Sequence, residues 1–309
     1  MKDKIYSVLP HLVFVIIFIA SGYLIMSASA GIPIFILASS LVIYLWSREL
    51  LGKWWALLPP FLFGFSPIIP AMDPYFTVST ATVFGFILAL YLFTKFLSSR
   101  TNRHLLWAGI GLGIALSINA YDIILIPIYL IILIFFWFGE TARMKIPGTK
   151  RFFGFIGDFV LILIVALALT YIAYLIPVFN FSYPISQYFS DVSNAVHGLG
   201  SGIRIYSLIK YFPKNMLPIS ILSVLSFCFG AKSILSKFKG GKLADKFLEY
   251  LGTNFAEFSL FAMTIIYSAY IIKYSSGGGL ENFLPILPFV YILTASGLKN
   301  WLNRNHLFQ

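Results

Sequence analysis

The chain has 309 residues, of which 59% are hydrophobic and only 11% carry a formal charge. A soluble domain carries about 25% charged residues, and a soluble fold of this length could not remove so much apolar surface from water. A single cysteine, Cys228, excludes an internal disulfide and a cysteine-built zinc site. The composition therefore predicts a polytopic membrane protein, and it excludes soluble enzymes, disordered tails and disulfide-rich secreted domains.

The chain offers ten apolar runs as candidate transmembrane helices, since a spanning helix needs about 20 mostly apolar residues. We expect an all-α protein with a single transmembrane domain over residues 1–309. The first run is also typical of a cleavable signal peptide, but its length favours an uncleaved helix. In chain order the runs are 6–26, 32–46, 54–69, 75–97, 105–118, 121–138, 153–179, 217–235, 255–272 and 283–298.

The basic residues alternate between the two sides of these runs. With a cytoplasmic N-terminus, 18 of the 22 Lys and Arg residues lie on the inner side, including those of the basic loop 231–254. Cytoplasmic loops of membrane proteins are rich in Lys and Arg, so both termini are predicted to be cytoplasmic. The positive charge then indicates orientation and contact with anionic membrane lipids, and no nucleic-acid partner is expected.

Candidate chemistry gathers on the opposite, outer side. The loop 180–216 is the one long outer connection, and connections of this length are usually functional or disordered. Its aromatic and glycine content predicts an ordered loop. No ionisable residue falls at the centre of a predicted span, which argues against a proton-coupled transporter. The outer side holds Asp73, Asp122, Asp191 and Glu281, together with His197 and Arg204.

Each of these residues also has a structural explanation. Asp73 precedes Pro74 at the start of the fourth run, where an acid caps a helix and proline fits its first turn. Asp122 lies between two runs and could cap the sixth. His197 is the only outer histidine, and it lies within the long glycine-bearing loop. Carboxylates with one imidazole could serve general acid–base chemistry or a divalent metal ion, so both roles stay open.

The order of several segments resembles a known enzyme family. Residues 42–53 read Val-Ile-Tyr-Leu-Trp-Ser-Arg-Glu-Leu-Leu-Gly-Lys, and an apolar run ending Gly-Phe-Ser-Pro follows. Asp73 opens a span, residues 106–117 form a glycine-rich apolar stretch, and His197 lies upstream of Tyr206. The chain closes with Glu-Asn-Phe-Leu-Pro-Ile-Leu-Pro-Phe at 281–289. This order resembles the GT-C membrane glycosyltransferases of the protein O-mannosyltransferase and aminoarabinose-transferase group.

The resemblance implies an enzyme of the plasma or equivalent inner membrane that takes a sugar from a polyprenyl-phosphate donor. It would transfer the sugar on the outer face to a lipid, protein or glycan acceptor. Catalytic roles would fall to Asp73 and Asp122, and a divalent metal ion would bind at His197. We expect substrate contacts from Arg204, Tyr206, Glu281 and Asn282.

Two features depart from the family pattern. The first outer loop, about 27–31, contains no acid, although relatives usually carry a key carboxylate there. Asn282-Phe283 stands where Arg-Tyr is usual. The chain is also short for the family, so we expect a truncated or divergent member. Alternative readings are a non-catalytic scaffold or accessory subunit with a partner membrane subunit, and a transporter of lipids or small solutes.

Overall fold

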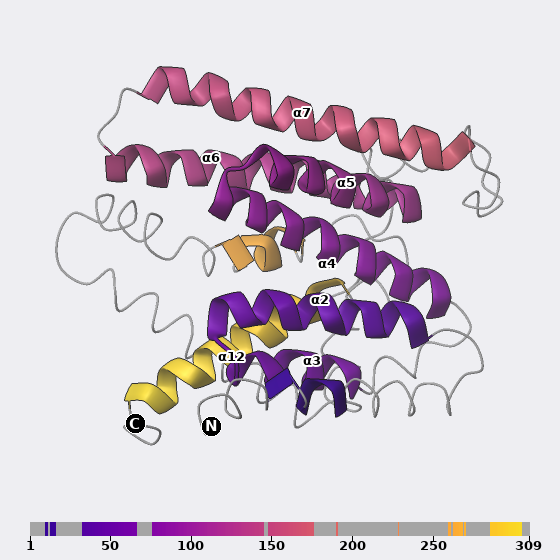
Figure 1. Ribbon diagram of the computed structural model, residues 1–309, viewed down its shortest axis with the longest axis vertical. Helices are drawn as coiled ribbons and strands as arrows, with labels where there is room; N and C mark the ends of the chain where they lie inside the picture. The colour runs from indigo at the N-terminus through magenta and orange to yellow at the C-terminus, as the bar shows by residue number, and fades with distance from the viewer. Residues whose placement is uncertain are drawn as a thin grey trace. The chain divides into compact units, whose positions relative to one another are not determined.

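The fold is described from a computed structural model, in which the regular elements of the described residues are all helical (Figure 1). The expectation of an all-α membrane protein is confirmed for this part of the chain. The count of ten spans, the cytoplasmic termini and the single domain stay predictions. The described residues are 10–11, 13–16, 33–66, 76–144, 148–175, 190, 228, 259–260, 262–267, 269 and 285–304.

Seven α-helices and two short 3₁₀ helices (η1 and η2) have defined bounds in the described residues, and they follow the predicted apolar runs closely. The bounds are α2 Pro33–Leu51, η1 Trp55–Leu57, α3 Leu58–Gly64, α4 Phe76–Ser99, α5 Asn102–Ile118, η2 Ala120–Ile124, α6 Leu125–Met144, α7 Gly148–Leu175 and α12 Leu287–Arg304.

Three segments of these helices are long and apolar enough to cross a membrane: Ile34–Leu51, Thr80–Ser99 and Phe152–Ala173. Two shorter apolar helical segments, Trp55–Gly64 and Asp122–Phe138, accompany them in the described residues. Buried backbone groups in a bilayer must find partners within the protein, and a helix satisfies them within its own segment. Length and composition together therefore indicate an integral membrane protein.

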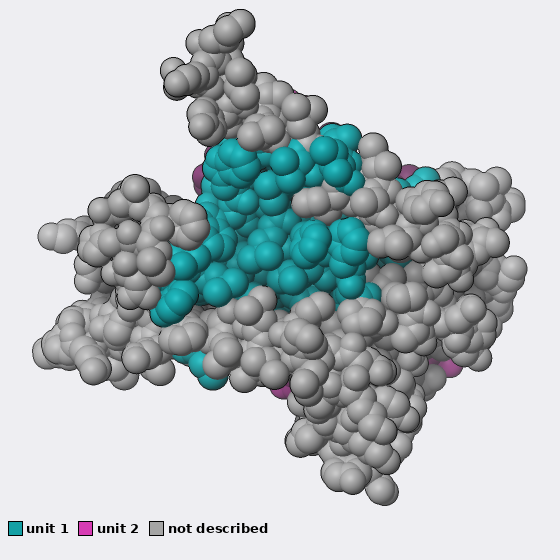
Figure 2. Space-filling view, turned by 90° about the horizontal axis from the view of Figure 1, so that it is seen from below, with its two compact units in different colours: residues 1–84, 204–236, 278–309 teal, residues 85–203, 237–277 magenta. Residues whose placement is uncertain are grey.

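The chain divides into two compact units, which interleave along the sequence. Described residues of unit 1 are teal in Figure 2, and little of unit 2 can be seen in that view. Unit 1 comprises residues 1–84, 204–236 and 278–309, and unit 2 comprises residues 85–203 and 237–277. The boundary between residues 84 and 85 lies inside α4.

Unit 1 is organised around α2, α3 and α12 (Figure 1). The fully buried Trp46 of α2 meets Phe289 of α12 edge to face, with ring centroids 5.7 Å apart. Tyr291 of α12 donates a hydrogen bond to Ser66 Oγ, just beyond α3, at 3.3 Å. Aromatic packing and one polar contact thus join helices that are more than 200 residues apart in sequence.

The described residues near the N-terminus pack on α2. Phe14 stacks on Tyr44 with ring centroids 4.1 Å apart and an interplanar angle of 14°. The Tyr44 hydroxyl also shares a hydrogen bond of 2.8 Å with Nδ1 of His11. Stacked aromatic pairs stabilise a fold beyond the area they bury, so Phe14, within the first apolar run, belongs to the core of unit 1.

Unit 2 contains α5, α6, α7 and the second part of α4. Figure 1 shows α5, α6 and α7 side by side. Phe93 of α4 stacks on Tyr129 of α6 at 3.9 Å, and the Tyr129 hydroxyl donates a 2.6 Å hydrogen bond to the Ala89 carbonyl. This hydroxyl is fully buried, and the carbonyl gives it the partner that burial requires. The α4–α6 contact is therefore specific as well as apolar.

Candidate functional site

The turn between α5 and α6 carries the one candidate catalytic residue that lies within the described chain, Asp122. Asn119 ends α5 in an extended conformation, with φ −146° and ψ 121°, and its N–H donates to the Ala115 carbonyl. The Asp122 N–H then donates to the Asn119 carbonyl at 3.0 Å, inside η2. This short 3₁₀ helix holds Asp122 at the base of a turn between two apolar helices.

Asp122 is buried, and its Oδ2 atom has no hydrogen-bond partner in the part of the chain that the structure describes. The residue exposes only 1% of its surface, and among the described residues no donor reaches Oδ2. A capping carboxylate accepts hydrogen bonds from the first N–H groups of its helix. This oxygen accepts none from the described part of α6, so Oδ2 is not a capping atom there.

A buried carboxylate oxygen without a partner is costly, because burial removes the water that would solvate it. Ionisable groups within membrane proteins are rare for this reason, and they commonly mark a substrate or ion pathway. Asp122 is thus the described acid with unused capacity to accept hydrogen bonds from a bound molecule.

A second acid of unit 2 lies near the opposite end of α5. Asp158 of α7 forms an ion pair with Arg100, whose Nη1 lies 3.7 Å from Asp158 Oδ2. Arg100 precedes Thr101, which caps α5, and α5 is about 25 Å long at 1.5 Å per residue. Asp122 follows the other end of α5, so the two acids are separated by the length of this helix.

The Arg100 guanidinium is held by aromatic rings as well as by Asp158. Its Cζ lies 4.3 Å from the Phe136 ring centroid, 4.2 Å from that of Phe155 and 5.6 Å from that of Phe96. A cation over an aromatic face is attracted by the ring quadrupole. The contacts of the Arg100–Asp158 pair therefore give this acid a structural role.

Most of the predicted site falls outside the residues that the structure describes. Only Asp122 is placed, so the structure brings none of the candidates together. Among the described residues, no group of three His, Cys, Asp or Glu side chains could hold a metal ion. The predicted site residues beyond the described part of the chain are Asp73, His197, Arg204, Tyr206, Glu281 and Asn282.

Comparison with known families assigns the N-terminal half of the chain. Residues 14–167 match the family described as dolichyl-phosphate-mannose-protein mannosyltransferase. The chain belongs to this family. It is therefore, in general terms, a mannosyltransferase-like membrane glycosyltransferase, which agrees with the GT-C resemblance seen in the sequence. No curated protein matches the chain.

The matched region contains Asp73 and Asp122 but none of the other candidate site residues. It covers α2 through most of α7, and both acids lie between apolar runs on the predicted outer side. The family assignment therefore rests on the part of the chain that carries these two carboxylates.

Sequence reasoning did not find the Arg100–Asp158 pair. The available signal was weak: Asp158 lies in the first turns of a predicted span, and Arg100 lies in a basic segment on the same predicted side. Opposite charges on one side of the membrane can pair only if their helices are neighbours. The periodicity of the sequence does not predict that α5 packs against α7. The burial of Asp122 was not predicted either, because an acid between two apolar runs is typical of an exposed loop.

Proposed function

We propose that the chain transfers a sugar from a polyprenyl-phosphate carrier to an acceptor hydroxyl on the outer face of the membrane. The observation that carries the proposal is the family match over a region whose one described outer acid, Asp122, is buried with a free oxygen. A sugar carries several hydroxyl groups that donate hydrogen bonds. Its binding site must therefore offer acceptor atoms, and a buried carboxylate oxygen without a partner is such an atom.

In the proposed reaction the acceptor oxygen attacks the anomeric carbon of the donor sugar. The bond from that carbon to the carrier phosphate breaks, and polyprenyl phosphate leaves with the electron pair. The proton of the acceptor hydroxyl passes to a carboxylate, a role that we assign to Asp73. Asp122 accepts hydrogen bonds from the sugar or the acceptor, which orients them for attack.

The remaining predicted contacts surround the leaving group. Arg204 would offset the phosphate charge with its fork of donors, and Tyr206, Glu281 and Asn282 would contact substrate. His197 would orient the donor or bind a divalent metal ion. No step proposed here passes through a metal ion.

The test is a transfer assay with the full chain in lipid nanodiscs. Radiolabelled polyprenyl-phosphate mannose is the donor, and a lipid, a peptide and a glycan serve in turn as acceptors. We expect transfer by the wild type and a loss of roughly 10²–10⁴-fold in Asp73→Asn, the range typical of a removed general base. Asp122→Asn should lose about tenfold to a hundredfold, because it weakens charge-assisted hydrogen bonds to the substrate.

Asp158→Asn is the matched control, since it removes an intramembrane carboxylate that lies near the other end of α5. It should leave transfer within about twofold of the wild type. A folded wild-type protein that transfers no sugar from a panel of polyprenyl-phosphate donors would contradict the proposal. Equal activity in Asp73→Asn and the wild type would contradict the assigned base.

A second candidate function is a non-catalytic accessory subunit. It is favoured by the absence of any acid in the predicted first outer loop, about residues 27–31. Stable co-purification with a larger membrane protein, together with unchanged cellular function in the Asp73→Asn/His197→Ala double variant, would support this role over catalysis.

A further inference from the structure

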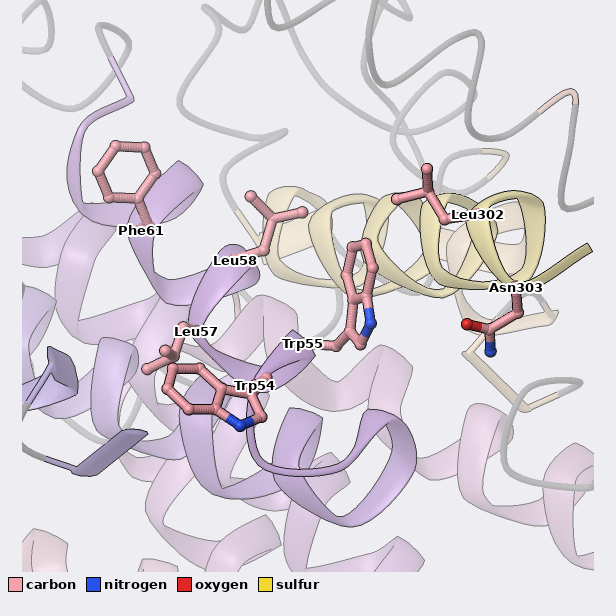
Figure 3. A pocket seen from close by; sticks show the side chains of 7 residues that line it. All are labelled: Trp54, Trp55, Leu57, Leu58, Phe61, Leu302 and Asn303. Carbon is pink, nitrogen blue, oxygen red and sulfur yellow. The ribbon is translucent and has the colours of Figure 1, made fainter. Parts of the chain in front are cut away.

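Unit 1 has an apolar pocket of about 730 Å³ at one end of its helices (Figure 3). Its volume lies within the range of about 300–1,000 Å³ that is typical of sites for small molecules. The lining comes from η1, α3 and the last turns of α12, and Figure 3 shows Trp55 beside Leu302 and Asn303. The lining side chains used below are Trp54, Trp55, Leu58, Phe61, Leu302 and Asn303.

A glycine turn and a lysine shape this end of the unit. Gly52 ends α2 with φ +81°, a conformation that L side chains rarely adopt, and the chain then enters η1. The Lys299 ammonium of α12 donates a 2.9 Å hydrogen bond to the Leu51 carbonyl, at the last residue of α2. This contact fixes α12 against the end of α2, beside the turn from which Trp54 and Trp55 project.

Exposed aromatic and basic residues lie around this end of the unit. Trp54 and Phe61 expose 48% and 43% of their surfaces, although both are large and apolar. Arg48 and Lys53 are exposed on either side of the Gly52 turn. Tryptophan is enriched where a membrane meets water, because its ring is apolar and its N–H needs a polar partner.

The charge at this end is mainly positive. Arg48, Lys53 and Lys299 lie in residues 45–58 and 296–303, against the single acid Glu49. By the distribution of Lys and Arg this is the cytoplasmic end of the spans, and anionic phospholipids are concentrated in the cytoplasmic leaflet. An apolar pocket bordered by amphipathic rings and cations complements a molecule with an acyl chain and an anionic headgroup.

We propose that this pocket binds one anionic phospholipid of the cytoplasmic leaflet. An acyl chain occupies the space between Trp55, Leu58 and Leu302, and the headgroup phosphate lies beside Arg48 and Lys53. The site takes a lipid that is not the sugar donor, and it lies at the end of the spans opposite to the predicted outer acids. Its existence does not depend on glycosyl transfer.

The test uses the full chain in nanodiscs that contain phosphatidylcholine and phosphatidylglycerol in equal amounts. Native mass spectrometry after release counts the lipids that stay bound and identifies their headgroups. We expect one retained lipid, with phosphatidylglycerol preferred over phosphatidylcholine. Removing the charges in Arg48→Gln and Lys53→Gln should lower this preference by about fivefold for each charge.

Two further variants separate the pocket from the general lipid surface. Leu58→Trp narrows the pocket where the acyl chain is placed, so it should lower retention of the specific lipid. Phe153→Trp adds an indole on α7 at a side chain that is 72% exposed and lies in the other unit, so retention should not change. Equal retention of the two headgroups by the wild type would overturn the proposal. Unchanged headgroup preference in the Arg48→Gln/Lys53→Gln double variant, whose positions are exposed and tolerate substitution, would overturn it as well.

Discussion

At the scale of single residues, Arg100 shows how one side chain can join three helices. It follows α4 with φ +54°, a conformation that is costly for a residue other than glycine. Its guanidinium lies over Phe136 of α6 and Phe155 of α7, and it pairs with Asp158 of α7. The aromatic contacts and the ion pair explain why the strained backbone persists at this position.

We predict that the rings around Arg100 matter more to stability than its acid partner. The side chains of Arg100 and Asp158 are 28% and 37% exposed, and an exposed ion pair is worth about 0–1 kcal/mol. Two close cation–ring contacts are worth about 0.5–2 kcal/mol each. Arg100→Gln should therefore lower the free energy of unfolding by about 1–3 kcal/mol, and Asp158→Asn by less than about 1 kcal/mol. Thermal unfolding of the purified protein in detergent measures both.

The double variant tests the same interpretation. Arg100→Gln leaves the Asp158 carboxylate unpaired near the membrane, so adding Asp158→Asn should recover part of the lost stability. An equal loss from both single variants would mean that the ion pair dominates, and the aromatic contacts would then contribute little.

At this scale the sequence offered a candidate residue but not its environment, and the role of that residue stays a prediction. Asp122 was predicted as a candidate from its place between two runs, yet its burial depends on how η2 folds the chain back between α5 and α6. The Arg100 contacts depend on three helices meeting at one point. Local sequence patterns report which face of a helix is apolar, but they do not report which helix covers it.

At the scale of elements, α5 shows how small residues bring helices together. A Cβ added at Gly109 would lie 2.7 Å from Val165 Cβ of α7, and one at Gly113 would lie 2.9 Å from the Ala166 carbonyl oxygen. Membrane helices that approach closely use small residues at this spacing of four. Thr170 of α7 reinforces the contact, because its hydroxyl lies 3.4 Å from the Gly113 carbonyl oxygen.

We predict that Gly113→Ala destabilises unit 2. The new methyl group meets a backbone carbonyl, which cannot rotate away, so α5 and α7 must separate by a few tenths of an ångström. Overpacking of this kind costs about 1–3 kcal/mol. Thermal unfolding in detergent, read against the wild type, should show the loss as a lower Tm.

Gly157→Ala on α7 is the control, since a Cβ at that position meets nothing within 4 Å. Alanine favours a helix over glycine by about 0.8–1.0 kcal/mol, so this variant should keep or raise the Tm. A Tm for Gly113→Ala equal to that for Gly157→Ala would show that α5 and α7 are not in close contact.

The helices themselves were largely predictable. The runs 32–46, 75–97 and 105–118 lie within or close to α2, α4 and α5, because long apolar stretches in lipid have few alternatives to a helix. The run 54–69 contains prolines and could be broken or partly re-entrant, and the described structure begins it with η1 and ends α3 at Gly64. Pairing of α5 with α7 was not predicted, since glycines within an apolar run look like weak helix formers until a neighbour is known.

At the scale of the whole molecule, both proposed sites depend on the orientation of the chain in the membrane. The sugar-transfer proposal needs Asp73 and Asp122 on the outer side, and the lipid proposal needs Arg48 and Lys53 on the cytoplasmic side. Both follow from one distribution, in which 18 of the 22 basic residues fall on the same, predicted cytoplasmic side of the runs. A single topology experiment therefore bears on both ends of the protein.

We predict that residue 98 is cytoplasmic and residue 276 is external. The chain has one cysteine, so Cys228→Ser gives a background without thiols into which Ser98→Cys or Ser276→Cys can be placed. Ser98 is exposed near the end of α4, and Ser276 lies in the predicted outer loop before the last span. A membrane-impermeant maleimide should label Ser276→Cys in intact cells, and Ser98→Cys only in inverted vesicles. Labelling of both positions from the same side would mean an even number of spans between them, in place of the five predicted runs, and would contradict the topology on which both proposals depend.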